Sequence, residues 1–274
     1  MNLAKRVASA LVLLPLVLGA IHWGGLPFFA VLVVALAISL HEGLGLVVPD
    51  ASDRRIQAMI LGATLGALAG LMLQGADSLA LGLTVLLLGS ALSAAAVVAR
   101  PEPLENAAQR WIGSVFVALY VGVPLLLLFA LRDVGSQGSG SRFIYLCMAA
   151  TWSNDTLAYF TGRTFGKNPL HPVVSPKKTW EGFAGGAVGS VVASWVCHAT
   201  FLPELGAIQA IVYGLVMAPL VPLGDLAESL LKRSAGIKDS GSIIPGHGGL
   251  LDRVDALLFA VPWTFMMAYY AVGP

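Results

Sequence analysis

Acidic side chains able to bind a metal ion are concentrated between residues 224 and 255. Asp252 and Asp255 are three residues apart at the expected start of a helix, so their carboxylates share one face. Asp225 lies in the preceding helix, on one face with Glu228 and Ser229. Carboxylates from two helices, completed by water and substrate phosphates, are a usual way to hold Mg²⁺. The spacing predicts a metal site of Asp225, Asp252 and Asp255; the plainer alternative is that the last two only complement a helix dipole.

A glycine-rich turn with the sequence PGHGGLLDR joins these two helices. Gly248 and Gly249 allow a backbone that turns its amide groups toward an anion. The surrounding cations are Lys232, Arg233, Lys238 and Arg253. His247 can donate a hydrogen bond to a phosphate, or it is only a structural residue of the turn. The run lacks the Walker A pattern, yet its charges suit a nucleoside triphosphate with its metal.

A second polar stretch follows the sixth apolar segment. Asn154 and Asp155 lie within that segment, and a buried aspartate is costly without a partner, so we expect a polar cavity beside it. The loop that follows carries Arg163, Lys167, Lys177 and Lys178. These cations form a basic rim where lipid headgroups lie, although a solvated cytoplasmic loop is the simpler reading for any one of them.

The elements that position these residues are membrane-spanning helices. The chain is 57% hydrophobic and 11% charged, against roughly 25% charged residues in a soluble domain. A crossing needs about 20 mostly apolar residues. The expected helices are 7–22, 27–46, 57–74, 79–98, 111–131, 142–161, 180–199, 206–231 and 252–272. The fold class is therefore all-α and polytopic, with nine spans, or eight if the short, glycine-rich third segment does not cross.

Basic residues test this count independently, because lysine and arginine gather on the cytoplasmic side of a membrane protein. With a cytoplasmic N-terminus, 14 of the 16 fall on that side, and only Arg132 and Arg142 fall outside. The C-terminus is then expected outside. Residues 1–131 carry few polar groups and are predicted to be a scaffold, and residues 132–274 are predicted to be the catalytic region.

Other features of the chain are less informative. A net charge of +1 gives no reason to expect a nucleic-acid partner. Cys147 and Cys197 are far apart in apolar segments and read as buried small residues. His41 and Glu42 end the second expected span, where snorkelling or helix-end pairing explains them.

The polar stretches together resemble a known family. Residues 229–255, SLLKRSAGIKDSGSIIPGHGGLLDRVD, are similar throughout to the signature of the phosphatidate cytidylyltransferases, and residues 153–182 are similar to the same family. The resemblance covers about the last 125 residues of the sequence. It implies a bacterial inner-membrane homodimer with a polar cavity open to the cytoplasm. It also implies that phosphatidate and CTP give CDP-diacylglycerol and pyrophosphate with Mg²⁺, with or without a second cation.

The resemblance also suggests roles for the residues. The implied catalytic residues are Asp225, Lys232, Asp252, Arg253 and Asp255. The implied nucleotide contacts are Asn154, Asp155, Lys238, Asp239, His247, Gly248 and Gly249. The implied lipid-phosphate contacts are Arg163, Lys167, Ser175, Lys177 and Lys178. A phosphomonoester is largely dianionic at neutral pH, so it can attack without a protein base, and the protein supplies positioning and charge neutralisation.

Two other functions remain open from the sequence. A CTP-dependent kinase of a polyprenol or phytol would transfer the γ-phosphoryl group to a hydroxyl and would favour an activating base. A transporter or channel would use Asp155 and Asp225 along a cation path, but the polar groups gather at the inner helix ends, which argues against a path through the membrane. A CDP-alcohol phosphotransferase is disfavoured, because the DGxxAR run is absent.

Overall fold

The computed structural model describes residues 3–73, 79–135, 138–244 and 248–273. The long helices are α1 (Leu3–Trp23), α2 (Gly25–Val47), α3 (Ala51–Leu73), α4 (Leu79–Ala99), α5 (Ala107–Val117), α6 (Val123–Leu131), α7 (Ser139–Phe165), α8 (Trp180–Thr200), α9 (Ala207–Ser234) and α10 (Leu251–Val272). Three short turns are η1 (Leu104–Asn106), η2 (Ala118–Gly122, a π-helical turn) and η3 (Pro203–Leu205). The all-α, polytopic membrane class is confirmed.

Each expected span coincides with a helix, and the fifth comprises α5, η2 and α6 in one apolar run. Among the described residues, seven helices are long and apolar enough to cross a membrane. The apolar part of α1, Leu11–Trp23, is shorter. Helix α7 has 27 residues but is more polar than these seven helices. Nine crossings and the orientation of the termini therefore remain predictions.

A small β-hairpin was not expected from the sequence. Strand β1 (Pro169–His171) pairs antiparallel with β2 (Ser175–Thr179) between α7 and α8. The carboxylate of Glu181 at the start of α8 ties this segment down by accepting from the backbone N–H of Lys167 at 3.1 Å and from Asn168 Nδ2 at 2.7 Å. The strands are too short and too polar to show the alternating apolar pattern that marks a half-buried strand.

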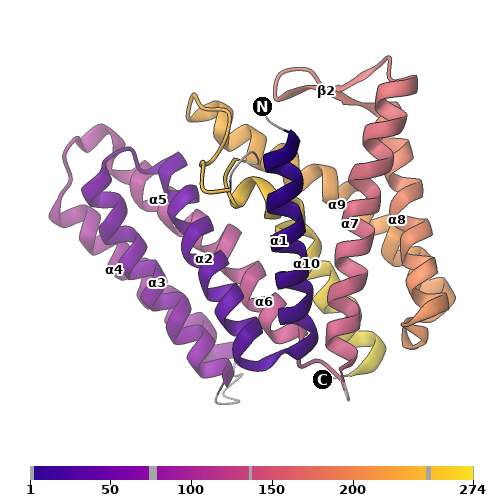
Figure 1. Cartoon of the computed structure of the whole chain (residues 1–274). Helices are drawn as coiled ribbons and strands as arrows, with labels where there is room; N and C mark the ends of the chain where they lie inside the picture. The colour runs from indigo at the N-terminus through magenta and orange to yellow at the C-terminus, as the bar shows by residue number, and fades with distance from the viewer. Residues whose placement is uncertain (1–2, 74–78, 136–137, 245–247, 274) are drawn as a thin grey trace.

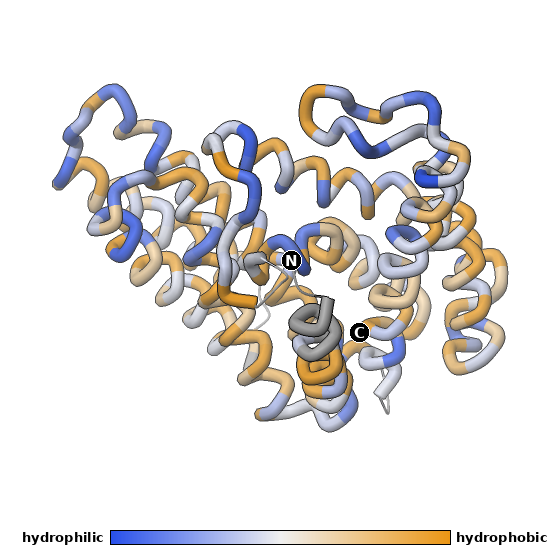
Figure 2. Tube along the Cα trace, turned by 45° about the horizontal axis from the view of Figure 1, so that its top comes forward, coloured by the Kyte–Doolittle hydropathy of each residue, from blue (hydrophilic) through white to orange (hydrophobic). Residues whose placement is uncertain are grey.

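The helices run side by side, with connections at both ends of the bundle (Figure 1). Helix α1 begins at the end that carries β2, and α10 ends at the opposite end (Figure 1). Hydrophilic stretches are concentrated around the hairpin and the neighbouring loops, whereas the helices are mainly hydrophobic (Figure 2). This arrangement matches an up-and-down membrane bundle with one polar end.

Glycines let the helices around the polar end approach closely. On α8, Gly182 and Gly186 face α7, where an added Cβ would lie 2.9 Å from the Ala158 carbonyl oxygen and 2.7 Å from Asn154 Oδ1. Small residues four apart are a usual way for membrane helices to approach closely. On α9, a Cβ at Gly224 would lie 2.7 Å from the carbonyl oxygen of Asp255 on α10. The last contact brings α9 and α10 together beside the predicted site.

Candidate active site

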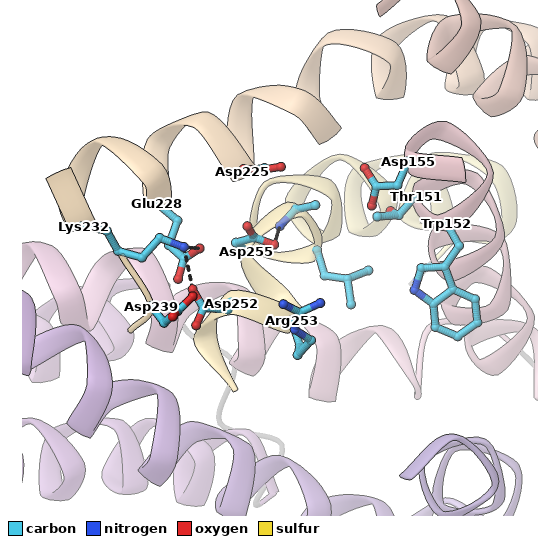
Figure 3. A pocket seen from close by; sticks show the side chains of 12 residues that line it. Thr151, Trp152, Asp155, Asp225, Glu228, Lys232, Asp239, Asp252, Arg253 and Asp255 are labelled. Atoms are coloured by element: carbon cyan, nitrogen blue, oxygen red, sulfur yellow. Dashed lines mark hydrogen bonds and ion pairs between the residues drawn. The ribbon is translucent and has the colours of Figure 1, made fainter. Parts of the chain in front are cut away.

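A polar cavity of about 410 Å³ opens between α7, α9 and α10. Its lining residues are Thr151, Trp152, Asp155, Asp225, Glu228, Lys232, Asp239, Asp252, Arg253, Asp255, Ala256 and Leu257. All of them belong to the part of the chain after residue 131. Figure 3 shows the charged side chains in two groups, one around Lys232 and one around Asp255.

The first group is a buried cation held between two carboxylates. Lys232 Nζ lies 2.7 Å from Glu228 Oε2, one turn earlier on α9, and 2.5 Å from Asp252 Oδ1 on α10. Glu228 is fully buried and Lys232 is 9% exposed. Because buried charges are costly unless paired, this contact fixes α9 against the first turn of α10.

The glycine-rich turn is organised around Asp252. Asp252 Oδ2 accepts from the backbone N–H of Ser240 at 3.0 Å and of Gly249 at 2.9 Å. Gly248 has a φ of +87°, and an added Cβ would lie 2.9 Å from the same oxygen, so this position favours glycine. The sequence predicted amide groups turned toward a bound phosphate. The Gly249 amide instead binds a carboxylate of the protein itself.

The second group consists of Asp155, Asp225 and Asp255, from three different helices. All three carboxylates line the same polar cavity. Asp225 Oδ1 accepts from Ser229 Oγ at 3.2 Å, which confirms their shared face on α9. Asp225 Oδ2 lies 2.8 Å from Nζ of Lys178. Among the described residues, Lys178 of the hairpin is thus the basic residue that contacts this group of three carboxylates.

A divalent metal suits this charge balance, because six carboxylates and only two cations line the cavity. Among the described residues, however, no three acidic, histidine or cysteine side chains converge closely enough to hold an ion by themselves. Asp252 is engaged by Lys232 and by backbone amides, and Asp225 is engaged by Lys178. The expected set of Asp225, Asp252 and Asp255 therefore stays a prediction. Mg²⁺ commonly takes one or two carboxylates plus water and substrate phosphates. Asp225 and Asp255, which face each other where α9 approaches α10, fit that requirement.

Several predicted nucleotide contacts lie in other surroundings. Asn154 is 2% exposed, and its Nδ2 donates to Ser190 Oγ at 2.8 Å, so as it stands it joins α7 to α8 and does not line the cavity. Lys238 is exposed on the loop, whereas Asp239 lines the cavity. His247 lies outside the described residues.

The predicted lipid-phosphate contacts lie on the hairpin and its flanks. Arg163 lies in the last turn of α7 and donates to the hydroxyl of Tyr159 at 2.8 Å, while Lys167 and Lys177 are exposed. Ser175 begins β2 and is half-buried. Only Lys178 among the described members of this set forms an ion pair with a cavity residue. The structure therefore brings one member into contact with the site and leaves the others on its polar rim.

An apolar cavity of about 1010 Å³ adjoins the polar one. It lies mainly between α1, α2, α7 and α10, and Leu257 lines both cavities. Ile243, Ile244 and Leu250, around the glycine-rich turn, also line it. The polar and the apolar cavity are therefore neighbours that share one lining side chain.

Two residues of the site were missed by reasoning from the sequence. Glu228 was placed on the correct face of α9, but its pairing with Lys232 was not predicted, although the spacing of four residues signals such a pair. Glu42 was explained as a helix-end residue. It is instead 4% exposed and accepts the backbone N–H of Leu251 at 2.8 Å. A carboxylate at the end of an apolar span is a functional candidate by default, and that signal was available.

The fold and the site together define a polytopic membrane protein with a charged cavity beside an apolar one. A profile of the cytidylyltransferase family matches residues 4–271, and the chain belongs to this family.

Similarity to individual proteins agrees with this membership. The chain is 38% identical to the phosphatidate cytidylyltransferase of Bacillus subtilis (strain 168) over 150 residues, 55% of each protein. It is 44% identical to that of Mycobacterium tuberculosis (strain ATCC 25618 / H37Rv) over 149 residues, 53% of this chain and 44% of the relative. For that of Mycobacterium leprae (strain TN), the identity is 41% over 170 residues, 60% of this chain and 52% of the relative. The chain spans about half the length of these curated relatives.

Proposed function

We propose that this protein is a phosphatidate cytidylyltransferase that converts CTP and phosphatidate into CDP-diacylglycerol and pyrophosphate. One observation carries the proposal beyond family membership: a polar cavity with paired charges shares Leu257 with an apolar cavity. The polar cavity suits the phosphates of both substrates, and the apolar cavity suits the acyl chains of the lipid. A soluble phosphate acceptor would have no use for the second cavity.

The reaction is an in-line displacement at the α-phosphorus of CTP. An oxygen of the lipid phosphate forms the new bond to phosphorus, and the bond to the oxygen bridging the α- and β-phosphates breaks. Pyrophosphate leaves with the electron pair of that bond. The lipid phosphate is already largely dianionic, so no side chain has to remove a proton, and rate enhancement comes from positioning and charge stabilisation.

The residues of the cavity divide this work. Arg253 lines the cavity and forms no ion pair among the described residues, so its guanidinium is free to bind a phosphate. Lys232, fixed by Glu228 and Asp252, supplies positive charge at a constant position. Asp225 and Asp255 would hold Mg²⁺, which supplies charge neutralisation to the triphosphate when bound. Lys178 would leave Asp225 as the lipid phosphate enters.

The setting follows from the same reasoning. We place the protein in a bacterial inner membrane, with the hairpin and the α9–α10 loop on the cytoplasmic side where CTP is found. The basic residues of these segments support that orientation. A homodimer is part of the proposal and derives from the family resemblance alone.

Product analysis tests the proposed reaction directly. The purified protein in detergent is incubated with Mg²⁺ and CTP labelled either at the α- or at the γ-phosphorus, in parallel reactions with phosphatidate, a polyprenol or phytol as the acceptor. We expect the α-label to enter a lipid that migrates as CDP-diacylglycerol, and the γ-label to appear in pyrophosphate. Transfer of the γ-label to a polyprenol or to phytol would show a lipid-alcohol kinase instead. No transfer of either label would contradict both enzymes.

A further inference from the structure

The carboxylate of Glu42 lies against the loop that joins α9 to α10, although Glu42 belongs to α2. Its two oxygens accept the backbone N–H groups of Leu250 at 3.2 Å and Leu251 at 2.8 Å. Among the described residues, no basic side chain forms an ion pair with it. The negative charge is therefore stabilised by the amino-terminal amides of α10, where the helix dipole favours an anion.

The loop is shaped to accommodate this carboxylate. An added Cβ would lie 2.8 Å from Glu42 Cδ at Gly241 and 2.7 Å from Oε2 at Gly249. Ser240 Oγ lies 3.5 Å from the same oxygen. Larger side chains at the two glycines would push the loop away from α2, so the close approach depends on the residue types of the loop as well as on Glu42.

Two carboxylates together hold the loop. Glu42 accepts the amides of Leu250 and Leu251, and Asp252 accepts those of Ser240 and Gly249. Asp252 is in turn fixed by Lys232. Glu42 therefore links the scaffold helix α2 to the segment that places Asp239, Asp252 and Arg253 at the cavity.

We propose that Glu42 is a positioning residue for the nucleotide side of the site. Glu42 fixes the α9–α10 loop and the first turn of α10 against α2. The predicted nucleotide contacts of the loop are thereby held in position beside the cavity. Its kinetic consequence rests on the proposed function and deepens it, because Glu42 then governs CTP binding without touching either substrate.

Steady-state kinetics of Glu42→Gln and Glu42→Ala, with both substrates varied, test the kinetic consequence. The matched control is His41→Gln, because His41 is the neighbouring residue on α2 and is exposed. We expect the KM for CTP to rise about tenfold in Glu42→Ala, because the loop that carries the predicted nucleotide contacts loses the charge-assisted hydrogen bonds that hold it against α2, and to rise less in Glu42→Gln, which keeps one acceptor. The KM for phosphatidate should stay within about twofold. A purely structural role would lower the amount of active protein and leave both KM values unchanged, which would overturn the proposal.

Hydrogen–deuterium exchange gives a readout that does not need activity. In both Glu42 variants, peptides covering Ser240 and Leu250–Leu251 should exchange about tenfold faster, while α8 peptides should match the wild type. Unchanged loop exchange in Glu42→Ala would refute the positioning role. If the wild type makes no cytidylyl lipid, the proposed function fails, and exchange still decides the role of Glu42. If neither variant folds, Gly241→Ala perturbs the contact from the loop side and must loosen the same peptides.

Discussion

At the scale of single residues, the polar cavity is lined by more carboxylates than cations. A bound metal cation would balance this negative charge. Asp255 belongs to the acidic group with Asp155 and Asp225 (Figure 3). We expect Asp255→Asn to lower turnover at least about a hundredfold, because stabilisation of developing phosphate charge is usually the largest catalytic term. The measurement is the rate as a function of Mg²⁺ concentration, with the amount of folded protein checked by size-exclusion chromatography.

Glu204→Gln serves as the control for this substitution. Glu204, in η3 after α8, pairs with Arg142 at 2.7 Å, and neither residue lines the cavity. Its turnover and Mg²⁺ dependence should equal those of the wild type. Near-normal, Mg²⁺-dependent turnover in Asp255→Asn would refute the assignment of Asp255 to the metal.

Lys232 and Lys178 both pair with carboxylates of the site, but their burial differs. Lys232→Met leaves Glu228 and Asp252 buried without a cation, which should cost about 3–5 kcal/mol. The side chains of Lys178 and Asp225 are 23% and 39% exposed, so Lys178→Met should cost at most about 1 kcal/mol. Thermal unfolding of the two variants in the same detergent measures the difference. Equal losses of stability would show that the Lys232 cluster is not the stabilising contact of α9 and α10.

The residue types of the site were predictable from the sequence, but their partners were only partly so. Spacing within one helix correctly placed Asp225 on one face with Ser229. The cost of burying an aspartate correctly predicted a polar cavity beside Asp155. Contacts between distant segments were not encoded in any spacing: the approach of Lys178 to Asp225 needs the hairpin, and the approach of Glu42 to Leu251 needs α2 packed against α10. Asn154 looked like a site residue because it is polar within an apolar helix, yet its partner is Ser190 on α8.

At the scale of elements, hydrophobic runs identified the long helices, because a helix that crosses a membrane needs about 20 mostly apolar residues. The hairpin of β1 and β2 was not predicted from hydrophobic runs, since its strands carry no apolar face. The apolar cavity was not predicted either, because all the helices around it are hydrophobic, and composition alone does not reveal a gap in their packing.

That cavity gives a prediction for α2. Ala35 lines it, whereas Ala37 on the same helix is exposed and does not. If the cavity holds an acyl chain, Ala35→Trp should raise the KM for a long-chain phosphatidate about tenfold, roughly the effect of losing a few buried methylene contacts. The KM for CTP and for a short-chain, water-soluble phosphatidate should change little. Ala37→Trp should behave as the wild type, and equal effects of the two substitutions would contradict acyl binding in this cavity.

At the scale of the whole molecule, one mechanism requires that all polar segments of the site lie on the same side of the membrane. The hairpin of β1 and β2 and the connection between α9 and α10 both lie at the polar end of the bundle, while α10 ends at the other (Figures 1 and 2). The distribution of basic residues predicts that this polar end is cytoplasmic. Reporter fusions in whole bacteria can test both statements together.

We expect a cytoplasm-active reporter inserted after Pro172 or after Gly236 to be active, and one fused after Gly273 to be inactive. A reporter that is active only in the periplasm should give the opposite pattern. The hairpin and the α9–α10 loop must agree with each other whichever way the protein is inserted, because Lys178 of the hairpin contacts Asp225 and the loop surrounds Asp252 in the same cavity. Opposite locations for these two segments would rule out a single site made from both. Agreement of the two with a cytoplasmic Gly273 would instead leave the site intact and remove one crossing from the predicted nine.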